Sequence, residues 1–180
     1  MKNRTLTRGL VRAVATSAML AVLAGAAPGP VLADGVRPLP PFTVVSATGQ
    51  DVSASHLTTE ARWVLICVKP GATATSRLLA ALASWQLPPA TMNSLVFVVE
   101  GSVERASAYL ASQPDPRASG LVWYADPDGR AARALGVTGA LTLQGIRDGA
   151  IDWTVAGVLN DPAAFESVLR TWIGAPSAVR

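Results

Sequence analysis

The feature that most constrains the fold is a series of short apolar runs separated by segments with helical periodicity. Residues 63–68 and 95–99 are continuous apolar runs, and residues 120–125 form a third predicted strand. Between these strands, large apolar residues recur at helical spacing in 78–85, and residues 102–112 fit a second helix. Strands that are apolar throughout belong to sheets covered on both faces. The alternation predicts an α/β fold with a mixed central sheet, helices on both faces and right-handed crossovers.

Hairpins are predicted at both ends of this alternating region. Residues 42–46 and 51–54 are expected to form an N-terminal β-hairpin, because a turn sequence separates them. Residues 141–147 and 150–158 are expected to form a second hairpin. The Asp148-Gly149 pair between them is typical of a type I′ turn.

Residues with capping side chains mark the expected helix starts. Asp161 is predicted to cap the last helix, with Pro162 in its first turn, and a short helix is expected at 130–135. Thr73 or Thr75 is expected to cap the helix after the first apolar run. A hydroxyl at that position accepts a bond from an otherwise unpaired backbone N–H.

Residues 1–33 are predicted to be a secretory signal peptide. They combine a basic start without acidic residues, an apolar or small-residue run at 14–27, and small residues before a cleavage site after Ala33. The run is shorter than the roughly 20 residues of a comfortable membrane span. An uncleaved N-terminal anchor is the alternative interpretation. The expected location is therefore periplasmic or secreted.

The remaining chain is expected to form one domain. Residues 34–41 are a Pro-rich extended lead-in, 42–175 the folded domain and 176–180 a tail. A domain of this size buries enough surface to fold without a metal or a disulfide, and Cys67 has no second cysteine to pair with. Four of the 15 basic residues lie in the signal, which leaves 11 against 12 acidic residues. This balance argues against nucleic-acid binding.

Several short segments, in this order and spacing, resemble a known family. They are Leu39-Pro40-Pro41-Phe42, Gly49-Gln50-Asp51-Val52, Trp63-Val64-Leu65-Ile66, Tyr124-Ala125-Asp126-Pro127-Asp128-Gly129 and Arg147-Asp148-Gly149-Ala150-Ile151. The chain resembles exported thiol–disulfide oxidoreductases of the TlpA type and the related AhpC/TSA redoxins. The resemblance covers about residues 39–175 and implies a thioredoxin-like fold.

The resemblance fails at the positions that carry the chemistry. Its Cys-x-x-Cys pair falls on Thr73 and Ser76, followed by a basic residue at Arg77, and its cis-proline falls on Leu141. Disulfide exchange needs a thiolate nucleophile, which a helix N-terminus activates by lowering its pKa. A hydroxyl cannot form a disulfide. The redox site is therefore predicted to be degenerate.

Cys67 and His56 are the other candidates for chemistry. Cys67 lies between Ile66 and Val68 and is expected to be a packed core residue; the alternative is a one-cysteine peroxidase or redox sensor. His56 is the sole histidine and cannot complete a zinc or copper ligand set. Ser76 lacks the G-x-S-x-G setting of a nucleophile elbow.

These considerations predict a redoxin-like domain that binds a partner or stabilises a complex without catalysis. No cofactor, metal or nucleic acid is expected, the partner is an unidentified exported protein, and membrane contact is expected only through an uncleaved signal. The alternatives are an oxidoreductase that uses Cys67 alone, or an exported domain whose function no residue reveals. The predicted binding residues are Lys69, Pro70, Gly71, Ala72, Thr73, Ser76, Ala140 and Leu141.

Overall fold

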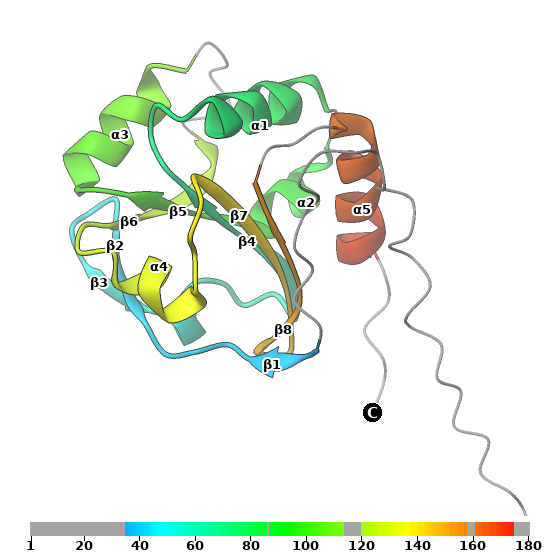
Figure 1. The fold of residues 1–180 in the computed structure, drawn as a ribbon, viewed down its shortest axis with the longest axis horizontal. Helices are drawn as coiled ribbons and strands as arrows, with labels where there is room; N and C mark the ends of the chain where they lie inside the picture. The colour runs from blue at the N-terminus through cyan, green and yellow to red at the C-terminus, as the bar shows by residue number, and fades with distance from the viewer. Residues whose placement is uncertain (1–34, 86, 114–119, 158–160, 175–180) are drawn as a thin grey trace, which may run out of the picture.

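The computed structural model describes residues 35–85, 87–113, 120–157 and 161–174, which form one mixed sheet with helices packed on it (Figure 1). The strand order is β1-β8-β7-β4-β5-β6-β2-β3. The strands are β1 Arg37–Pro38, β2 Thr43–Ser46, β3 Asp51–Ser53, β4 Arg62–Val68, β5 Leu95–Glu100, β6 Val122–Asp126, β7 Leu141–Arg147 and β8 Ala150–Ala156. The helices are α1 Thr73–Ser84, α2 Pro89–Asn93, α3 Val103–Ala111, α4 Arg130–Leu135 and α5 Pro162–Gly174, with a 3-10 turn at Ala54–His56.

The apolar strand β4 lies in the middle of the sheet. It runs parallel to β5 and antiparallel to β7, and β5 runs parallel to β6. Every residue of β4 after Arg62 is buried, as expected for a strand covered on both faces. The chain therefore leaves the core at the end of β4 and continues directly into the loop that precedes α1.

Alternation along β4 and β5 divides the core into two layers. Val64, Ile66 and Val68 pack with side chains of α1, α3 and α5. Leu65 and Cys67 face the other way and pack with α4 and the N-terminal hairpin. Each large apolar side chain that is fully buried contributes about 1.5–3 kcal/mol to stability. The two layers together hold the ends of β4, β5 and β6 in fixed positions.

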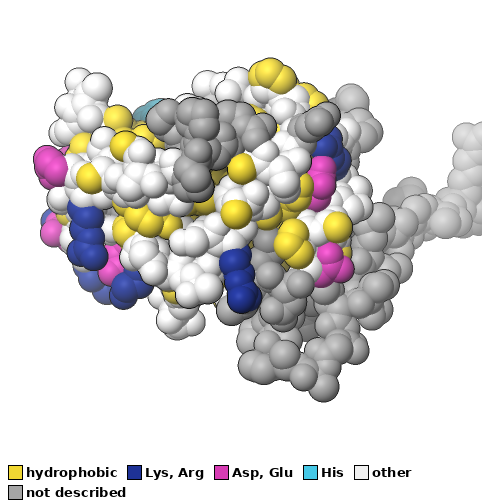
Figure 2. Space-filling view, turned by 90° about the horizontal axis from the view of Figure 1, so that it is seen from above, with side chains coloured by type: hydrophobic (Ala, Val, Ile, Leu, Met, Phe, Trp, Pro, Cys, Tyr) yellow, Lys and Arg dark blue, Asp and Glu magenta, His cyan; other side chains and the backbone are white. Residues whose placement is uncertain are grey.

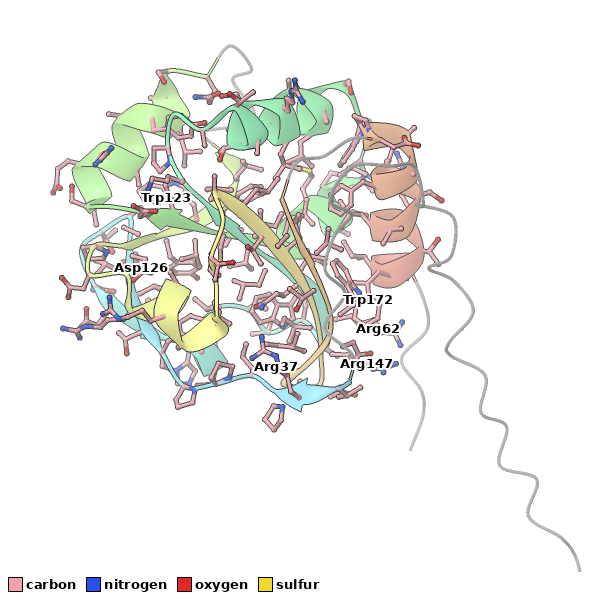
Figure 3. All side chains as sticks on the ribbon, in the orientation of Figure 1. Arg37, Arg62, Trp123, Asp126, Arg147 and Trp172 are labelled. Atoms are coloured by element: carbon pink, nitrogen blue, oxygen red, sulfur yellow. The ribbon has the colours of Figure 1, made fainter. Side chains whose placement is uncertain are left out.

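An arginine–tryptophan cluster fastens α5 to the sheet (Figure 3). Arg62 and Arg147 are paired across β4 and β7, and their guanidinium carbons lie 5.2 and 5.7 Å from the centre of the Trp172 ring. Arg147 also forms an ion pair with Asp152. The Trp172 indole N–H donates to the carbonyl of Trp63 at 3.3 Å. Stacking on the indole face offsets the proximity of two like charges.

The turn and cap predictions are confirmed in two places. Asp148 and Gly149 have φ of 50° and 76°, which are the two positive values that a type I′ turn requires. The Asp161 carboxylate accepts a hydrogen bond from the Ala164 N–H at 2.9 Å, and α5 begins at Pro162. The short helix α4 occupies the predicted residues 130–135.

The cap predicted for α1 is wrong. Ala72 holds the N-cap position and no side chain caps the helix; the hydroxyl of Thr75 is used elsewhere. Two elements were not expected from the sequence. The two-residue strand β1 lies in the predicted lead-in and pairs with β8, and the short helix α2 begins at Pro89. No helix among the described residues is both long and apolar enough to span a membrane.

Candidate functional site

The loop between β4 and α1 is held by main-chain contacts with the segment before β7. The Lys69 N–H donates to the Ala140 carbonyl at 2.9 Å, and the Ala72 N–H donates back to the Lys69 carbonyl at 3.3 Å. Gly71 has a φ of +80°, a left-handed conformation that glycine adopts without strain. These contacts bring residues 69–76 and Ala140 together. We call the solvent-accessible side of these residues the loop surface.

Thr75 fixes this arrangement from the inside. Its side chain is fully buried, and its hydroxyl lies 2.9 Å from the Lys69 carbonyl oxygen and 3.4 Å from that of Ala140. One hydroxyl therefore links the end of β4, the first turn of α1 and the segment that enters β7. A buried hydroxyl is stable only with such partners. Thr75 is a positioning residue for the loop surface.

Thr73 and Ser76, the two positions predicted to be degenerate redox positions, lie on the exposed side of the first turn of α1. Residues three apart on a helix share a face, so the two hydroxyls point to the same side. The single histidine does not serve them, because His56 is exposed next to β3 and its Nδ1 lies 2.8 Å from the Ser53 hydroxyl. Among the described residues, no base activates either hydroxyl.

The other predicted binding residues divide between surface and core. Lys69 and Gly71 are exposed, Pro70, Ala72 and Ala140 are half-buried, and Leu141 is 1% exposed in the core. Leu141 therefore supports the surface from below and is not available for contact. No peptide bond among the described residues is cis, so the chain enters β7 through a trans bond.

The charges near the loop surface are few. The Lys69 ammonium lies 3.4 Å from the Glu100 carboxylate, and both side chains are more than half exposed; such pairs contribute about 0–1 kcal/mol. Figure 2 views the molecule from above, the side where α1 lies uppermost in Figure 1. Apart from the atoms drawn in grey, charged side chains lie at the left and right sides and in the lower middle of this face, and hydrophobic and other atoms lie between them.

Cys67, the only thiol, points away from the loop surface into the layer under α4. It is 5% exposed, and its pKa rises from 9.0 to about 12, first because of burial and then because of the nearby Asp126 carboxylate. Asp126, at the end of β6, is 2% exposed and accepts hydrogen bonds from the Ala131 and Ala132 N–H groups. A thiol this strongly protonated is a poor nucleophile and metal ligand.

The space beside the thiol is small. A hollow of about 20 Å³ lies between Cys67, Lys69, Glu100 and Asp126, which is room for about one water molecule. No group of three or more histidine, cysteine, aspartate or glutamate side chains in the described chain can hold a metal ion. The surroundings of Cys67 therefore do not form a substrate pocket.

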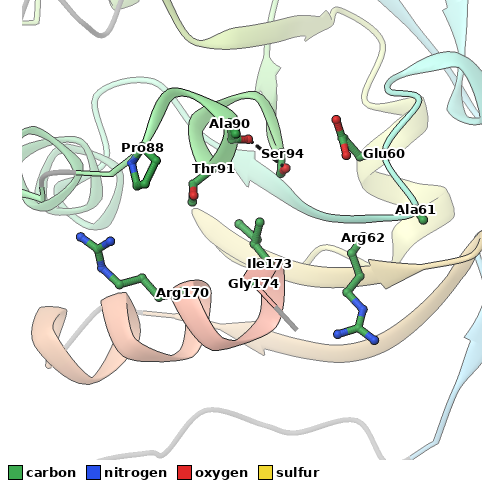
Figure 4. A pocket seen from close by; sticks show the side chains of 10 residues that line it. All are labelled: Glu60, Ala61, Arg62, Pro88, Ala90, Thr91, Ser94, Arg170, Ile173 and Gly174. Atoms are coloured by element: carbon green, nitrogen blue, oxygen red, sulfur yellow. Dashed lines mark hydrogen bonds between the residues drawn. The ribbon is translucent and has the colours of Figure 1, made fainter. Parts of the chain in front are cut away.

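A larger hollow lies at the opposite end of β4, away from the loop surface (Figure 4). It measures about 500 Å³ and is lined by residues that include Glu60, Arg62, Thr91, Arg170 and Ile173. The side chains of Glu60 and Arg62 point in different directions, and Arg170 bonds to Glu166 on its own helix. The charged groups of this hollow do not converge on one point.

Comparison with solved structures identifies the class. The chain has a thioredoxin-like fold. A protein described as a thiol:disulfide interchange protein DsbE, from Chlorobium tepidum, superposes with a TM-score of 0.64 at 22% identity, over 78% of this chain and 99% of that one. A secreted Mycobacterium tuberculosis disulfide oxidoreductase, homologous to E. coli DsbE, gives a TM-score of 0.55 at 14% identity, over 72% and 95% of the two chains.

A third similar structure is a thioredoxin-family thiol:disulfide interchange protein from Chlorobium tepidum, with a TM-score of 0.53 and 17% identity over 79% of this chain and all of that one. No protein-family model matches the chain, and no curated protein matches it. These three structural neighbours are described as thiol:disulfide interchange proteins or as a disulfide oxidoreductase, whereas this chain has a single cysteine and therefore no catalytic pair.

The roles of two residues that shape the site were not predicted from the sequence. Thr75 continues the buried helical positions Leu78, Leu79 and Leu82 toward the N-terminus, and this periodicity places its hydroxyl inside the protein. Asp126 looked like a turn residue in front of Pro127. It is also the last residue of the parallel strand β6, where its carboxylate accepts hydrogen bonds from N–H groups of the next helix.

Proposed function

We propose that this chain is an exported, redoxin-like domain that binds a partner protein through the loop surface and performs no thiol chemistry. The proposal depends mainly on one observation, that the loop is rigidly held but carries no sulfur nucleophile. The loop is tied down by the Thr75 hydroxyl and the Lys69–Ala140 bond, yet both positions that bear sulfur in the TlpA type carry oxygen. A rigid surface without a nucleophile suits binding, because little conformational freedom is lost on association.

Export is supported by the basic start and apolar run of residues 1–33. The Mycobacterium tuberculosis structural relative is also described as secreted. Use of Cys67 as a lone catalytic thiol is disfavoured by its burial and its pKa of about 12. The exposed residues Lys69, Gly71, Thr73 and Ser76 then remain as the contact groups.

The test replaces one exposed threonine at the loop surface and one elsewhere. Thr73→Trp places a bulky side chain on the loop surface, whereas Thr59→Trp places the same side chain on an exposed position before β4, at the far end of that strand. Proteins that co-purify with the tagged chain from the exported fraction are compared by mass spectrometry. We expect a partner retained by wild type and Thr59→Trp and lost from Thr73→Trp. If Thr73→Trp keeps every partner, the loop surface is not the binding site.

A further inference from the structure

Three polar side chains on neighbouring strands, two of them buried and one half-buried, form a cluster on the sheet face toward α4. Gln144 of β7 is paired directly with Thr154 of β8, and Thr142 lies two residues before Gln144 on the same face. Gln144 and Thr142 are 1% and 3% exposed. Thr142 is paired with Cys67 of the central strand β4, so the cluster lies beside the middle of the sheet and extends to β8.

Each member has an oxygen that is buried without a hydrogen-bond partner. These are Oε1 of Gln144, Oγ1 of Thr142 and Oγ1 of Thr154. A buried polar atom without a partner costs about 1–3 kcal/mol, and three of them on adjacent positions would be an unusual concentration of that cost. Apolar packing alone does not account for these three polar oxygens.

The other half of the Gln144 amide fixes its orientation. Its Nε2 donates to the carbonyl of Leu135 at 3.4 Å, and the guanidinium of Arg37 donates to the same oxygen at 3.1 Å. Leu135 is the last residue of α4, and cations are favourable at such helix ends. Because Nε2 of Gln144 faces α4, Oε1 of the same amide points away from the Leu135 carbonyl. This oxygen has no donor among the protein groups.

We propose that β7 and β8 carry an internal hydration site, in which ordered water donates to the Gln144 oxygen and bonds to the hydroxyls of Thr142 and Thr154. Water is the ligand that suits this set, because it both donates and accepts and it binds where two to four polar partners converge. A hydroxyl can serve as donor or acceptor, and the amide oxygen only accepts. The inference does not depend on the proposed partner binding.

The test is water deuteron relaxation dispersion on the folded protein, which detects internal waters with long residence times. We expect a dispersion step in wild type that is reduced in Thr142→Val/Thr154→Val and unchanged in Thr73→Val, whose hydroxyl is exposed. A dispersion step of equal size in wild type and the double variant overturns the proposal.

Thr154→Val alone serves as the second measurement, since Thr154 is only half-buried and the variant is the milder change. A bound water that loses one partner lowers the urea midpoint of unfolding relative to wild type. If no water is bound, the Thr154 hydroxyl has no hydrogen-bond partner, and Thr154→Val raises the urea midpoint, because valine has the same shape and removes an unsatisfied polar atom. A raised midpoint in Thr154→Val therefore contradicts the hydration site.

Discussion

Thr75 is the residue on which the geometry of the loop surface depends most. Removing its hydroxyl in Thr75→Val removes the bonds to the Lys69 and Ala140 carbonyls. We expect the free energy of unfolding to fall by about 1 kcal/mol, the usual net contribution of such a bond. Thr73→Val, on the exposed side of the same turn, is expected to change it by less than about 0.5 kcal/mol. Urea unfolding measures both, and equal effects would contradict the positioning role of Thr75.

Cys67 gives a prediction about pH. Its pKa in the folded protein is about 12, against an ordinary value of 9.0. Above pH 9 the unfolded chain loses the thiol proton while the folded chain keeps it, so the unfolded state binds fewer protons and stability falls as pH rises. The Cys67 contribution is therefore complete below about pH 9 and is lost progressively between about 9 and 12.

Cys67→Val removes the thiol and keeps an apolar side chain in the core. We expect the free energy of unfolding of this variant, measured with urea, to fall less between about pH 8 and about pH 10.5 than that of wild type, because these values lie on either side of the free thiol pKa.

The accessibility of the thiol is tested by labelling. In wild type at neutral pH, labelling of Cys67 is expected only after denaturation. Rapid labelling of the folded protein would show that the thiol is accessible after all.

At the scale of elements, the pairing of β7 with β8 depends on a glycine. A Cβ on Gly145 would overlap the indole of Trp153, its partner on β8. The Trp153 ring also packs edge-on against Trp172 of α5, with ring centres 5.8 Å apart. Gly145 therefore lets one tryptophan join the sheet to the C-terminal helix. A glycine inside a strand often marks such a close approach.

Gly145→Ala is expected to lower the free energy of unfolding by about 1–3 kcal/mol, because the added methyl group displaces the indole. In a Trp153→Ala background the same substitution should cost less, since the overlapping ring is gone. The double-mutant cycle, measured by thermal or urea unfolding, should give a coupling energy of about 0.5–3 kcal/mol. Additive effects would mean that the two residues do not compete for the same space.

The elements that the sequence predicts well are those whose signal is local. The apolar runs of β4 and β5, the Asp148-Gly149 turn and the Asp161 cap each depend on neighbouring residues. The elements it predicts poorly depend on distant contacts. β1 is a strand only because β8 lies beside it, and the hydroxyl of Thr75 does not cap α1 because it donates to the carbonyls of Lys69, just after β4, and Ala140, just before β7.

At the scale of the whole molecule, the fold could be predicted from the order of apolar segments and turns, because each layer must bury its own apolar face. The lack of a catalytic cysteine pair could be predicted from residue identity alone, because the sequence has one cysteine, whereas the assignment of the redox positions to Thr73 and Ser76 stays a prediction. The sequence did not predict which of the proposed binding residues are exposed to solvent. Leu141 and Ala140 are adjacent in sequence, but Leu141 begins β7, a strand buried on both faces as far as Ile146, and it therefore lies in the core.

The N-terminal segment gives a prediction for the whole chain. If residues 1–33 are a signal peptide, the exported protein begins at Asp34 and keeps β1, whose Arg37 bonds to the end of α4. Intact-mass measurement of the exported protein is expected to give the chain without residues 1–33. A mass that retains them indicates the uncleaved anchor.

The central claim is that a thioredoxin-like frame here performs no thiol–disulfide chemistry. The most direct measurement is insulin reduction by the purified chain beginning at Asp34, with dithiothreitol as reductant, beside Cys67→Ala and buffer without protein. The account predicts that all three samples turn over at the rate of dithiothreitol alone, because Thr73 and Ser76 carry no sulfur and Cys67 is buried. Enzymatic acceleration by wild type that disappears in Cys67→Ala would contradict it.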